Sequence, residues 1–222
     1  MIHYYPKEIF GHVVNMQTLY MSWFTMAIVI LVMYLATRKL QYLPSGAQNV
    51  VETLIDMLNS LMQANLGDKG RKYMAPFVIT LFMYIFIGNE IGLLPQVFPF
   101  HFTSPTNDIN TTLGLAIMVI LSVQIVGCMQ HGLGYLKHFI SPHPLFLPIT
   151  LIDESAKPIT MGFRLFGNIL AGEILLIVLN MLAPWLVPNI WILFSLAVGF
   201  LQAIIFSILT MSHFASAFRE HH

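Results

Sequence analysis

The chain has 222 residues, of which 57% are apolar and only 9% are charged, whereas soluble domains have about 45–50% apolar and about 25% charged residues. So few charges could not cover a water-exposed surface, and this composition predicts an integral membrane protein. Ten basic residues balance ten acidic ones, which excludes a positive field for nucleic acid, and the high hydrophobicity excludes a disordered chain.

Several segments are long and apolar enough to cross about 30 Å of hydrocarbon, which takes about 20 helical residues. We predict five spans, at residues 17–37, 73–94, 110–136, 159–183 and 189–218. Residues 46–66 differ, because apolar residues recur there at helical spacing while acidic and amide side chains share the other side. This pattern predicts an amphipathic helix that lies on the membrane surface or packs along other helices. The predicted fold is therefore an all-α integral membrane protein, with residues 1–222 forming a single membrane domain.

The distribution of Lys and Arg predicts the orientation, because these residues accumulate in short cytoplasmic loops. Residues 38–72 and 137–157 contain most of them, and Arg219 follows the last span. Residues 95–109 and 184–188 contain none. We therefore expect a multi-pass protein of the inner or plasma membrane, with its N-terminus outside and its C-terminus in the cytoplasm.

Proline marks the breaks between the later spans. The proline-containing stretch from Ser141 to Pro148 is expected to leave the helix before the fourth span. Pro184 and Pro188 bracket a tight outer turn, so the last two spans should form a helical hairpin. No internal repeat is visible in the sequence, which weakens an inverted-repeat transporter as an interpretation.

The fourth span carries a positive charge among apolar residues. Arg164 would cost about 2.5–3.5 kcal/mol at the bilayer centre, and a guanidinium cannot avoid this cost by losing its proton. Arg164 must face a polar pocket, water or an anionic partner; alternatively it is paired with an internal carboxylate or snorkels to the inner interface. At about 100° per residue, Asn168 stands nearly above Arg164, whereas Glu173 points to the opposite side and is a poor ion-pair partner. Three small residues allow a helix of this chain or of a partner to approach closely: Gly167, Ala171 and Gly172.

Polar residues form a line along the fifth span. Ser195, Gln202 and His213 are separated by 7 and 11 residues, and both steps return to nearly the same direction on a helix. This line indicates a facing polar surface or a water path. We expect Gln202 to contact the fourth span, because a buried amide without a partner is costly. Ser195 could instead bond to its own helix, as we expect for Ser207 and Thr210, and His213 is either a titrating group or a simple interfacial residue.

Acidic and amide residues also stand at the ends of the spans. Asp153 and Glu154 precede the fourth span on the inner side, and Asp153 is spaced for a local ion pair with Lys157. Three residues are expected to cluster at the outer ends of the second and third spans: Asn89, Glu90 and Asp108. Asp108 is also placed to cap the third span.

Motifs for bond-making chemistry are absent from the sequence. There is no GxxxxGK[ST], HExxH or GxSxG motif, and the nine His residues lack metal-ligand spacing. The single Cys128 can form neither an intramolecular disulfide nor a Cys-based metal cluster. We therefore expect no catalytic site in this chain, no cofactor and no bound metal.

Two runs of the sequence resemble subunit a of F-type ATP synthases. They are RLFGNILAGE at residues 164–173 and GFLQAIIFSILT at residues 199–210. Residues 88–95, 105–112 and 146–158 also resemble that family, so the resemblance covers nearly the whole chain. The compact chain and its doubled carboxylate before the fourth span resemble bacterial rather than organellar members.

This resemblance implies a stator subunit whose last two helices form a long, tilted hairpin around a rotating proteolipid ring, subunit c. The peripheral-stalk subunit b and the lipid bilayer would be further partners. H⁺ or Na⁺ would enter one half-channel, load a ring carboxylate and leave by a second half-channel, which couples ion flow to ATP synthesis. Arg164 would be the essential arginine that faces the ring carboxylate and separates the half-channels. The ion path would be lined by Asn89, Glu90, Asp108, Asp153, Glu154, Asn168, Glu173, Ser195, Gln202 and His213.

One position departs from that family pattern. Some members place a His or a carboxylate seven residues before the glutamine of the last span, where this chain has Ser195. Water or the outer-end residues would then complete the outer path. Two other interpretations stay open, a secondary transporter with its site at Arg164 and a non-transporting membrane scaffold. Co-purification with a ring of small two-helix proteolipids would favour the ATP synthase subunit over both alternatives.

Overall fold

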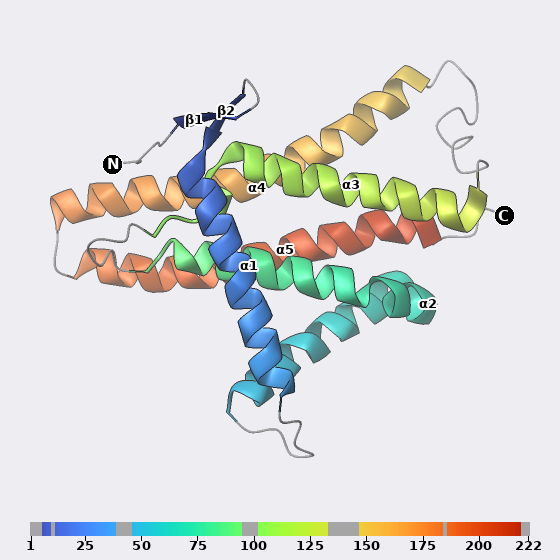
Figure 1. Ribbon diagram of the computed structural model, residues 1–222, viewed down its shortest axis with the longest axis horizontal. Coiled ribbons are helices and arrows are strands. Elements are labelled where there is room, and N and C mark those ends of the chain that lie inside the picture. Colours follow the sequence, from blue (N-terminus) through green and yellow to red (C-terminus); the bar gives the residue numbers. More distant parts are fainter. Residues whose placement is uncertain are drawn as a thin grey trace.

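Long apolar helices make up most of the computed structural model (Figure 1), which describes residues 6–9, 12–38, 46–94, 102–132, 147–183 and 186–218. The elements are the strands β1 (Pro6–Ile9) and β2 (His12–Asn15), the helices α1 (Met16–Thr37), α2 (Ala47–Ile91), α3 (Ile109–His131), α4 (Leu147–Leu182) and α5 (Val187–Phe218), and the 3-10 turn η1 (Pro105–Asn107). Each of the five helices is long and apolar enough to span a bilayer. The prediction of an all-α membrane protein is confirmed, with a small hairpin added at the start.

The hairpin of β1 and β2 was not predicted. The strands pair antiparallel, with Pro6 opposite Asn15. Asn15 then caps α1, because its Oδ1 accepts a hydrogen bond from the Gln17 N–H at 3.2 Å. An Asn at this position satisfies one of the free N–H groups of the first helical turn. Helix α1 crosses the other helices at a steep angle in Figure 1 and packs mainly against α2.

The predicted amphipathic helix and the predicted second span both lie within α2. They are separated by a kink at Gly67, whose φ of 67° lies in the region that favours glycine. Before the kink, Leu58 and Met62 are fully buried in the hydrophobic core, whereas Glu52 and Asp56 on the other side are exposed. The amphipathic helix is therefore confirmed, and its apolar face packs along other helices of the chain.

Helix α4 begins at Leu147, well before the predicted start at residue 159. It continues through Pro158, although a proline inside a helix typically costs about 3 kcal/mol. Pro148 lies in the first turn of α4, where the missing N–H of proline leaves no bond unmade. The prediction that the chain is non-helical as far as Pro148 is therefore wrong at its end, while residues 141–146 lie outside the described residues.

Helix α3 ends at His131, followed by Gly132 with φ at 61°. The last predicted residues of that span, 133–136, lie outside the described residues.

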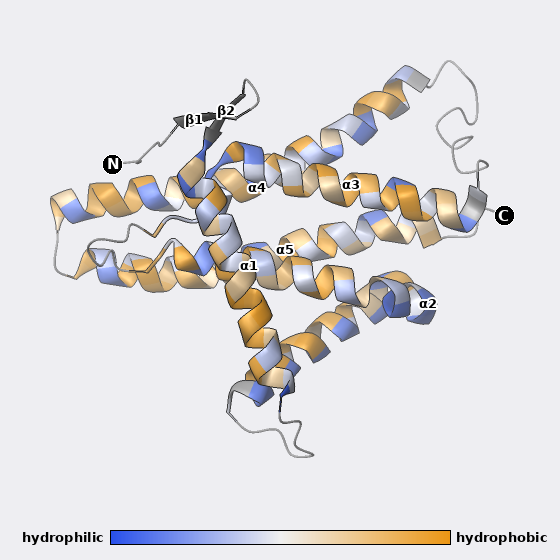
Figure 2. Cartoon of the chain, viewed as in Figure 1, coloured by the Kyte–Doolittle hydropathy of each residue, from blue (hydrophilic) through white to orange (hydrophobic). Residues whose placement is uncertain are grey.

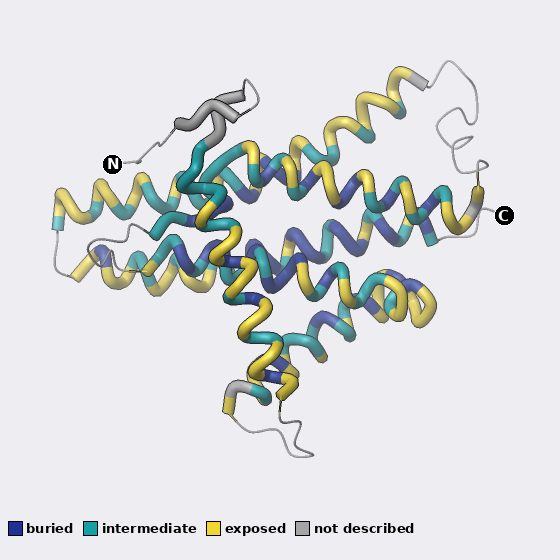
Figure 3. The backbone as a smooth tube through the Cα atoms, in the orientation of Figure 1, coloured by how far each residue is buried: buried dark blue, intermediate teal, exposed yellow. Residues whose placement is uncertain are grey.

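The predicted hairpin of the last two spans is confirmed. Helices α4 and α5 lie antiparallel and pack against each other, and the chain turns between Leu182 and Val187 (Figure 1). Helix α4 is the most exposed of the five, with only 6% of an apolar 18-residue stretch buried. Its exposed residues are largely apolar (Figures 2 and 3). The hairpin therefore offers a broad apolar surface that the described part of the chain leaves uncovered.

The side of α5 that faces away from this uncovered surface belongs to the hydrophobic core. Ala203 and Phe206 are buried there, and α2 makes the most extensive packing contact with α5. Phe200 of α5 contacts Phe82 and Phe86 of α2 edge to face, with ring centroids 6.1 and 5.4 Å apart. These ring contacts hold the middle of α5 against α2. This packing fixes one side of α5. It thereby sets the directions in which Ser195, Gln202 and His213 point.

Candidate functional site

Arg164 lies on the exposed side of α4. Within the described ranges, its guanidinium makes no hydrogen bond and no ion pair. The alternative of an Arg paired with an internal carboxylate is therefore not what the described residues show. Phe163 and Gly167 beside it are also exposed. The positive charge therefore lies on a largely apolar surface.

Gly167, the small residue nearest Arg164 in this run, serves no packing within the described chain, whereas the Gly172 carbonyl bonds to Trp191 of α5. A Cβ atom added at Gly167 or Gly172 would meet no atom within 4 Å, and Ala171 is exposed. Gly162 is the contrast, because a Cβ there would lie 2.7 Å from Leu113 Cδ2 and 3.1 Å from Leu113 Cα. Gly162 thus allows α3 to approach α4, whereas Gly167 and Gly172 leave open space.

A cavity of about 150 Å³ lies between the ends of α2, α4 and α5, and we call it the α4–α5 cavity. Four predicted site residues from three helices line it: Asn89, Asn168, Glu173 and Ser195. Arg164 does not line it. The structure therefore brings these four polar groups together and keeps the arginine on the outer surface of the hairpin.

A second cavity of about 260 Å³ is lined by the start of α1, the residues around η1 and the start of α3, and we call it the loop cavity. Asp108 lines it and caps α3, because its Oδ1 accepts a hydrogen bond from the Asn110 N–H at 2.9 Å. Thr18 of α1 donates to Asp108 Oδ2 at 3.2 Å. The predicted cap is confirmed, but the expected cluster is divided, since Asp108 lines this cavity and Asn89 lines the other.

Asn107 connects the two cavities. It lines the loop cavity, and its Nδ2 donates a hydrogen bond of 2.5 Å to Oε2 of Glu173. Glu173 in turn lines the α4–α5 cavity and is half-buried. The carboxylate of Glu173 is therefore held at the boundary between the two cavities.

Asn89 is almost fully buried, with 2% of its surface exposed. Its Nδ2 donates to the Gly199 carbonyl at 3.3 Å, and Thr106 Oγ1 donates to Asn89 Oδ1 at 2.7 Å. Gly199 also allows a carboxylate to come near, because an added Cβ would lie 2.9 Å from Glu90 Oε1. Asn89 and Glu90 of α2 thus lie directly against α5.

Several buried polar atoms have no hydrogen-bond partner in the part of the chain that the structure describes. They include Asn107 Oδ1 and Ser195 Oγ, whose residues line the cavities, and Glu90 Oε1 and Gln202 Nε2. Buried polar atoms are rarely left unsatisfied, and such groups commonly bond to water or ions. We expected Gln202 to contact the fourth span, and its amide nitrogen makes no hydrogen bond to α4 within the described residues. Ser195 does not bond to its own helix, whereas Ser207 and Thr210 do, as predicted, at 2.9 Å each.

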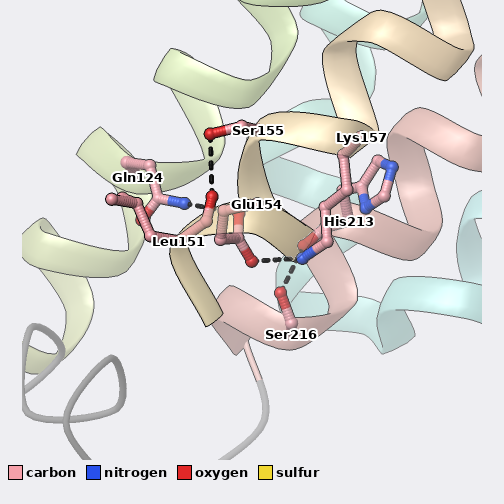
Figure 4. A network of polar contacts seen from close by, with 7 residues as sticks. All are labelled: Gln124, Leu151, Glu154, Ser155, Lys157, His213 and Ser216. Carbon is pink, nitrogen blue, oxygen red and sulfur yellow. Dashed lines mark hydrogen bonds and ion pairs between the residues drawn. The ribbon is translucent and has the colours of Figure 1, made fainter. Parts of the chain in front are cut away.

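A separate polar cluster lies near the start of α4 (Figure 4). Lys157 forms an ion pair with Glu154, and Gln124 of α3 donates to Glu154 Oε2 at 3.2 Å. The predicted pair of Lys157 with Asp153 is wrong, because Glu154 turns toward α3 while Asp153 is exposed. His213 of α5 lies beside Lys157 in Figure 4, and it is half-buried.

Sequence reasoning missed the residues that hold the two cavities in place. Asn107 contacts Glu173, and Ser104 Oγ donates to the Gly88 carbonyl at 2.8 Å. Trp191 Nε1 donates to the Gly172 carbonyl at 3.1 Å, which ties α5 to α4. The run of polar residues before the third span, SPTND at 104–108, was the available signal. Its partners, however, lie on other helices and cannot be identified from spacing.

Comparisons with known proteins agree over nearly the whole chain. A family model described as ATP synthase A chain matches residues 19–215, which include all of the candidate site residues. The chain is 38% identical over 205 residues to ATP synthase subunit a 3 of Pelobacter propionicus, covering 90% of this chain and 87% of that protein. It is 42% identical over 178 residues to ATP synthase subunit a of Acidothermus cellulolyticus, covering 78% and 66%. It is 35% identical over 224 residues to ATP synthase subunit a of Moorella thermoacetica, covering 100% of both.

Proposed function

Because the chain belongs to the ATP synthase A chain family, we propose that it is the ion-translocating stator subunit of an F-type ATP synthase in a bacterial membrane. In this proposal it provides two offset half-channels for H⁺ or Na⁺ to the carboxylates of a rotating proteolipid ring. The subunit itself makes and breaks no covalent bond in ATP. Its task is to pass the cation to the ring and receive it back on the other side of the membrane.

The observation that carries this proposal is the exposed, unpaired position of Arg164. No described residue neutralises its charge, and the exposed surface around it is largely apolar. In a bilayer such a charge requires an anionic partner or water. A carboxylate carried past α4 by another subunit meets this requirement, and the open space at the exposed Gly167 leaves room for a closely approaching helix.

The electrostatics of a fixed guanidinium account for the coupling. Arg164 attracts an ionised carboxylate and disfavours its protonated form, so a ring carboxylate releases its cation on reaching Arg164. The same charge repels a cation that would otherwise cross directly between the two water paths. Each elementary charge that crosses about 100 mV releases roughly 2.3 kcal/mol, which is available to drive the ring in one direction.

Polar groups on both sides of Arg164 support two separate half-channels. Toward the end of α4, the loop cavity and the α4–α5 cavity with Glu173 would form the outer half-channel. Toward its start, Glu154, Lys157 and His213 would line the inner one (Figure 4), with Asp153 near its mouth. Glu154 and Glu173 are separated by about 28 Å along α4 at 1.5 Å per residue. Arg164 lies almost midway between them.

The proposal is tested by Arg164→Ala in sealed, inverted membrane vesicles. We expect loss of coupled ATP synthesis, together with a passive leak of the cation, because nothing would separate the half-channels. Arg71→Ala is the matched control, since Arg71 is half-buried in α2, away from the candidate site, and pairs with the exposed Asp68. Full synthesis by an assembled Arg164→Ala complex would refute the proposal. Synthesis measured against pH, with and without Na⁺, identifies the cation.

A further inference from the structure

Asn107 links a residue of one cavity to a residue of the other through a hydrogen bond, whereas Ser104 simply lines both cavities. Asn107 lines the loop cavity while its Nδ2 donates to Oε2 of Glu173, which lines the α4–α5 cavity. These two atoms are in close contact, 2.5 Å apart. The contact joins residues 66 positions apart in the sequence. It therefore depends on how η1 docks against α4.

The turn that carries Asn107 is held from two sides. On the α2 side, Ser104 Oγ donates to the Gly88 carbonyl at 2.8 Å and Thr106 Oγ1 donates to Asn89 Oδ1 at 2.7 Å. On the α1 side, Thr18 Oγ1 donates to Asp108 Oδ2 at 3.2 Å. The residues on both sides of Asn107 are thus anchored. The amide of Asn107 is pre-organised by this anchored turn. Little conformational entropy is therefore lost when it binds the carboxylate.

The amide group of Asn107 has a different role at each of its two ends. Its nitrogen donates to Glu173, while its oxygen, Oδ1, is buried and accepts no hydrogen bond from any residue in the described ranges. An acceptor in this setting is suited to a water molecule or another proton donor arriving from the loop cavity. The amide would then hold the carboxylate on one side and the arriving donor on the other.

We propose that Asn107 is the positioning residue for Glu173, and that a cation passing from the loop cavity to the α4–α5 cavity is transferred at this pair. The inference rests on the proposed function, which supplies the cation flow. Asn107 acts by orienting the Glu173 carboxylate and the donor in front of it, and it takes up no proton itself. Losing Asn107 therefore slows transfer to Glu173 while both cavities stay in place.

The test compares ATP-driven cation pumping by membrane vesicles, normalised to the amount of assembled complex. A hydrogen bond to a charged group is stronger than one between neutral groups, so we expect Asn107→Ala to reduce pumping by about tenfold or more. Asn65→Ala is the matched control. Its amide bonds only to the Leu61 carbonyl of its own helix, in the exposed part of α2, and pumping should be unchanged.

A paired exchange separates positioning from simple structural support. Asn107→Asp alone places two carboxylates in contact, and Glu173→Gln alone removes the carboxylate from α4. The double variant Asn107→Asp with Glu173→Gln restores one carboxylate and one amide with their roles exchanged. We expect it to pump faster than either single variant, which a residue that only stabilises the turn would not produce.

Each outcome decides the inference. Wild-type pumping by assembled Asn107→Ala would overturn it. If Asn107→Ala does not assemble, the paired exchange decides. A double variant that pumps no faster than either single variant would overturn the inference. Arg164→Ala in the same assay separates this inference from the proposed function. Wild-type pumping by Arg164→Ala removes the proposed function. No pumping by Arg164→Ala together with wild-type pumping by Asn107→Ala removes only the role of Asn107.

Discussion

Arg164 and Glu173 lie on the same helix, α4, and point to opposite sides of it. The Glu173 carboxylate is half-buried and accepts a hydrogen bond of 2.5 Å from Asn107, whereas Arg164 is exposed and bonds to no described residue. Nine residues at about 100° each bring the second side chain round to the far side of the helix. One helix thus keeps a cation on its outer surface and a carboxylate in a cavity, so the two charges do not cancel each other.

Replacing Arg164 by Lys should also abolish coupled synthesis. An ammonium group is a compact charge on a flexible stem, and it can lose its proton when it is desolvated, whereas the guanidinium stays charged. ATP synthesis in sealed vesicles with an imposed ion gradient measures this. Arg71→Lys, at the partly exposed ion pair of α2 with Asp68, is the control that should keep its activity. Normal synthesis by Arg164→Lys would show that a permanent charge is not needed.

Glu173→Gln should slow ion translocation and leave assembly intact. The glutamine oxygen can still accept the hydrogen bond from Asn107, so the turn and α4 should keep their contact. The ionisable group is lost, however, and positioned proton-transfer groups are typically worth about 10²–10⁴-fold in rate. Pumping per assembled complex is the measurement. An assembled complex with unchanged flux would count against Glu173 as a relay.

Two glycines of α4 should respond differently to a larger side chain. Gly162→Ala should destabilise the chain by about 1–3 kcal/mol, as overpacking typically does, because the new Cβ would lie 2.7 Å from Leu113 Cδ2 and 3.1 Å from Leu113 Cα. Gly167→Leu should leave the chain's own stability nearly unchanged, because the space there is open. It should instead reduce association with the proteolipid ring. Thermal unfolding in detergent and the amount of co-purified proteolipid distinguish the two effects, and a Gly167→Leu complex with a full ring would contradict the second.

Glu154→Gln should reduce pumping several-fold. The change removes the ion-pair partner of Lys157 at a partly buried position next to His213 (Figure 4), and an uncompensated charge in such a place is costly. Ser155→Ala is the neighbouring control, because Ser155 is exposed and its hydroxyl donates only to the Leu151 carbonyl of its own helix. Equal pumping rates in the two variants would remove Glu154 from the proposed inner path.

Helix boundaries were predicted well where apolar length decides them and less well where proline was the guide. The break of α2 at Gly67 follows directly after the predicted amphipathic segment 46–66. The start of α4 was misplaced, because Pro158 was treated as a boundary although the helix runs through it. A proline removes one backbone bond, and the many remaining bonds and contacts of a long apolar helix outweigh that loss.

The sequence by itself determined the long apolar helices, the opposite directions of Arg164 and Glu173, and the cap that Asp108 forms on α3. All three follow from local rules, since apolar length, a fixed turn per residue and the free N–H groups of a first turn act within a few residues. The tertiary structure decided which partners the polar groups meet, namely Asn107 for Glu173 and Glu154, in place of Asp153, for Lys157. Such choices depend on how helices distant in sequence pack together, and a hydrogen bond of 2.5 Å forms only where that packing brings the two atoms into contact.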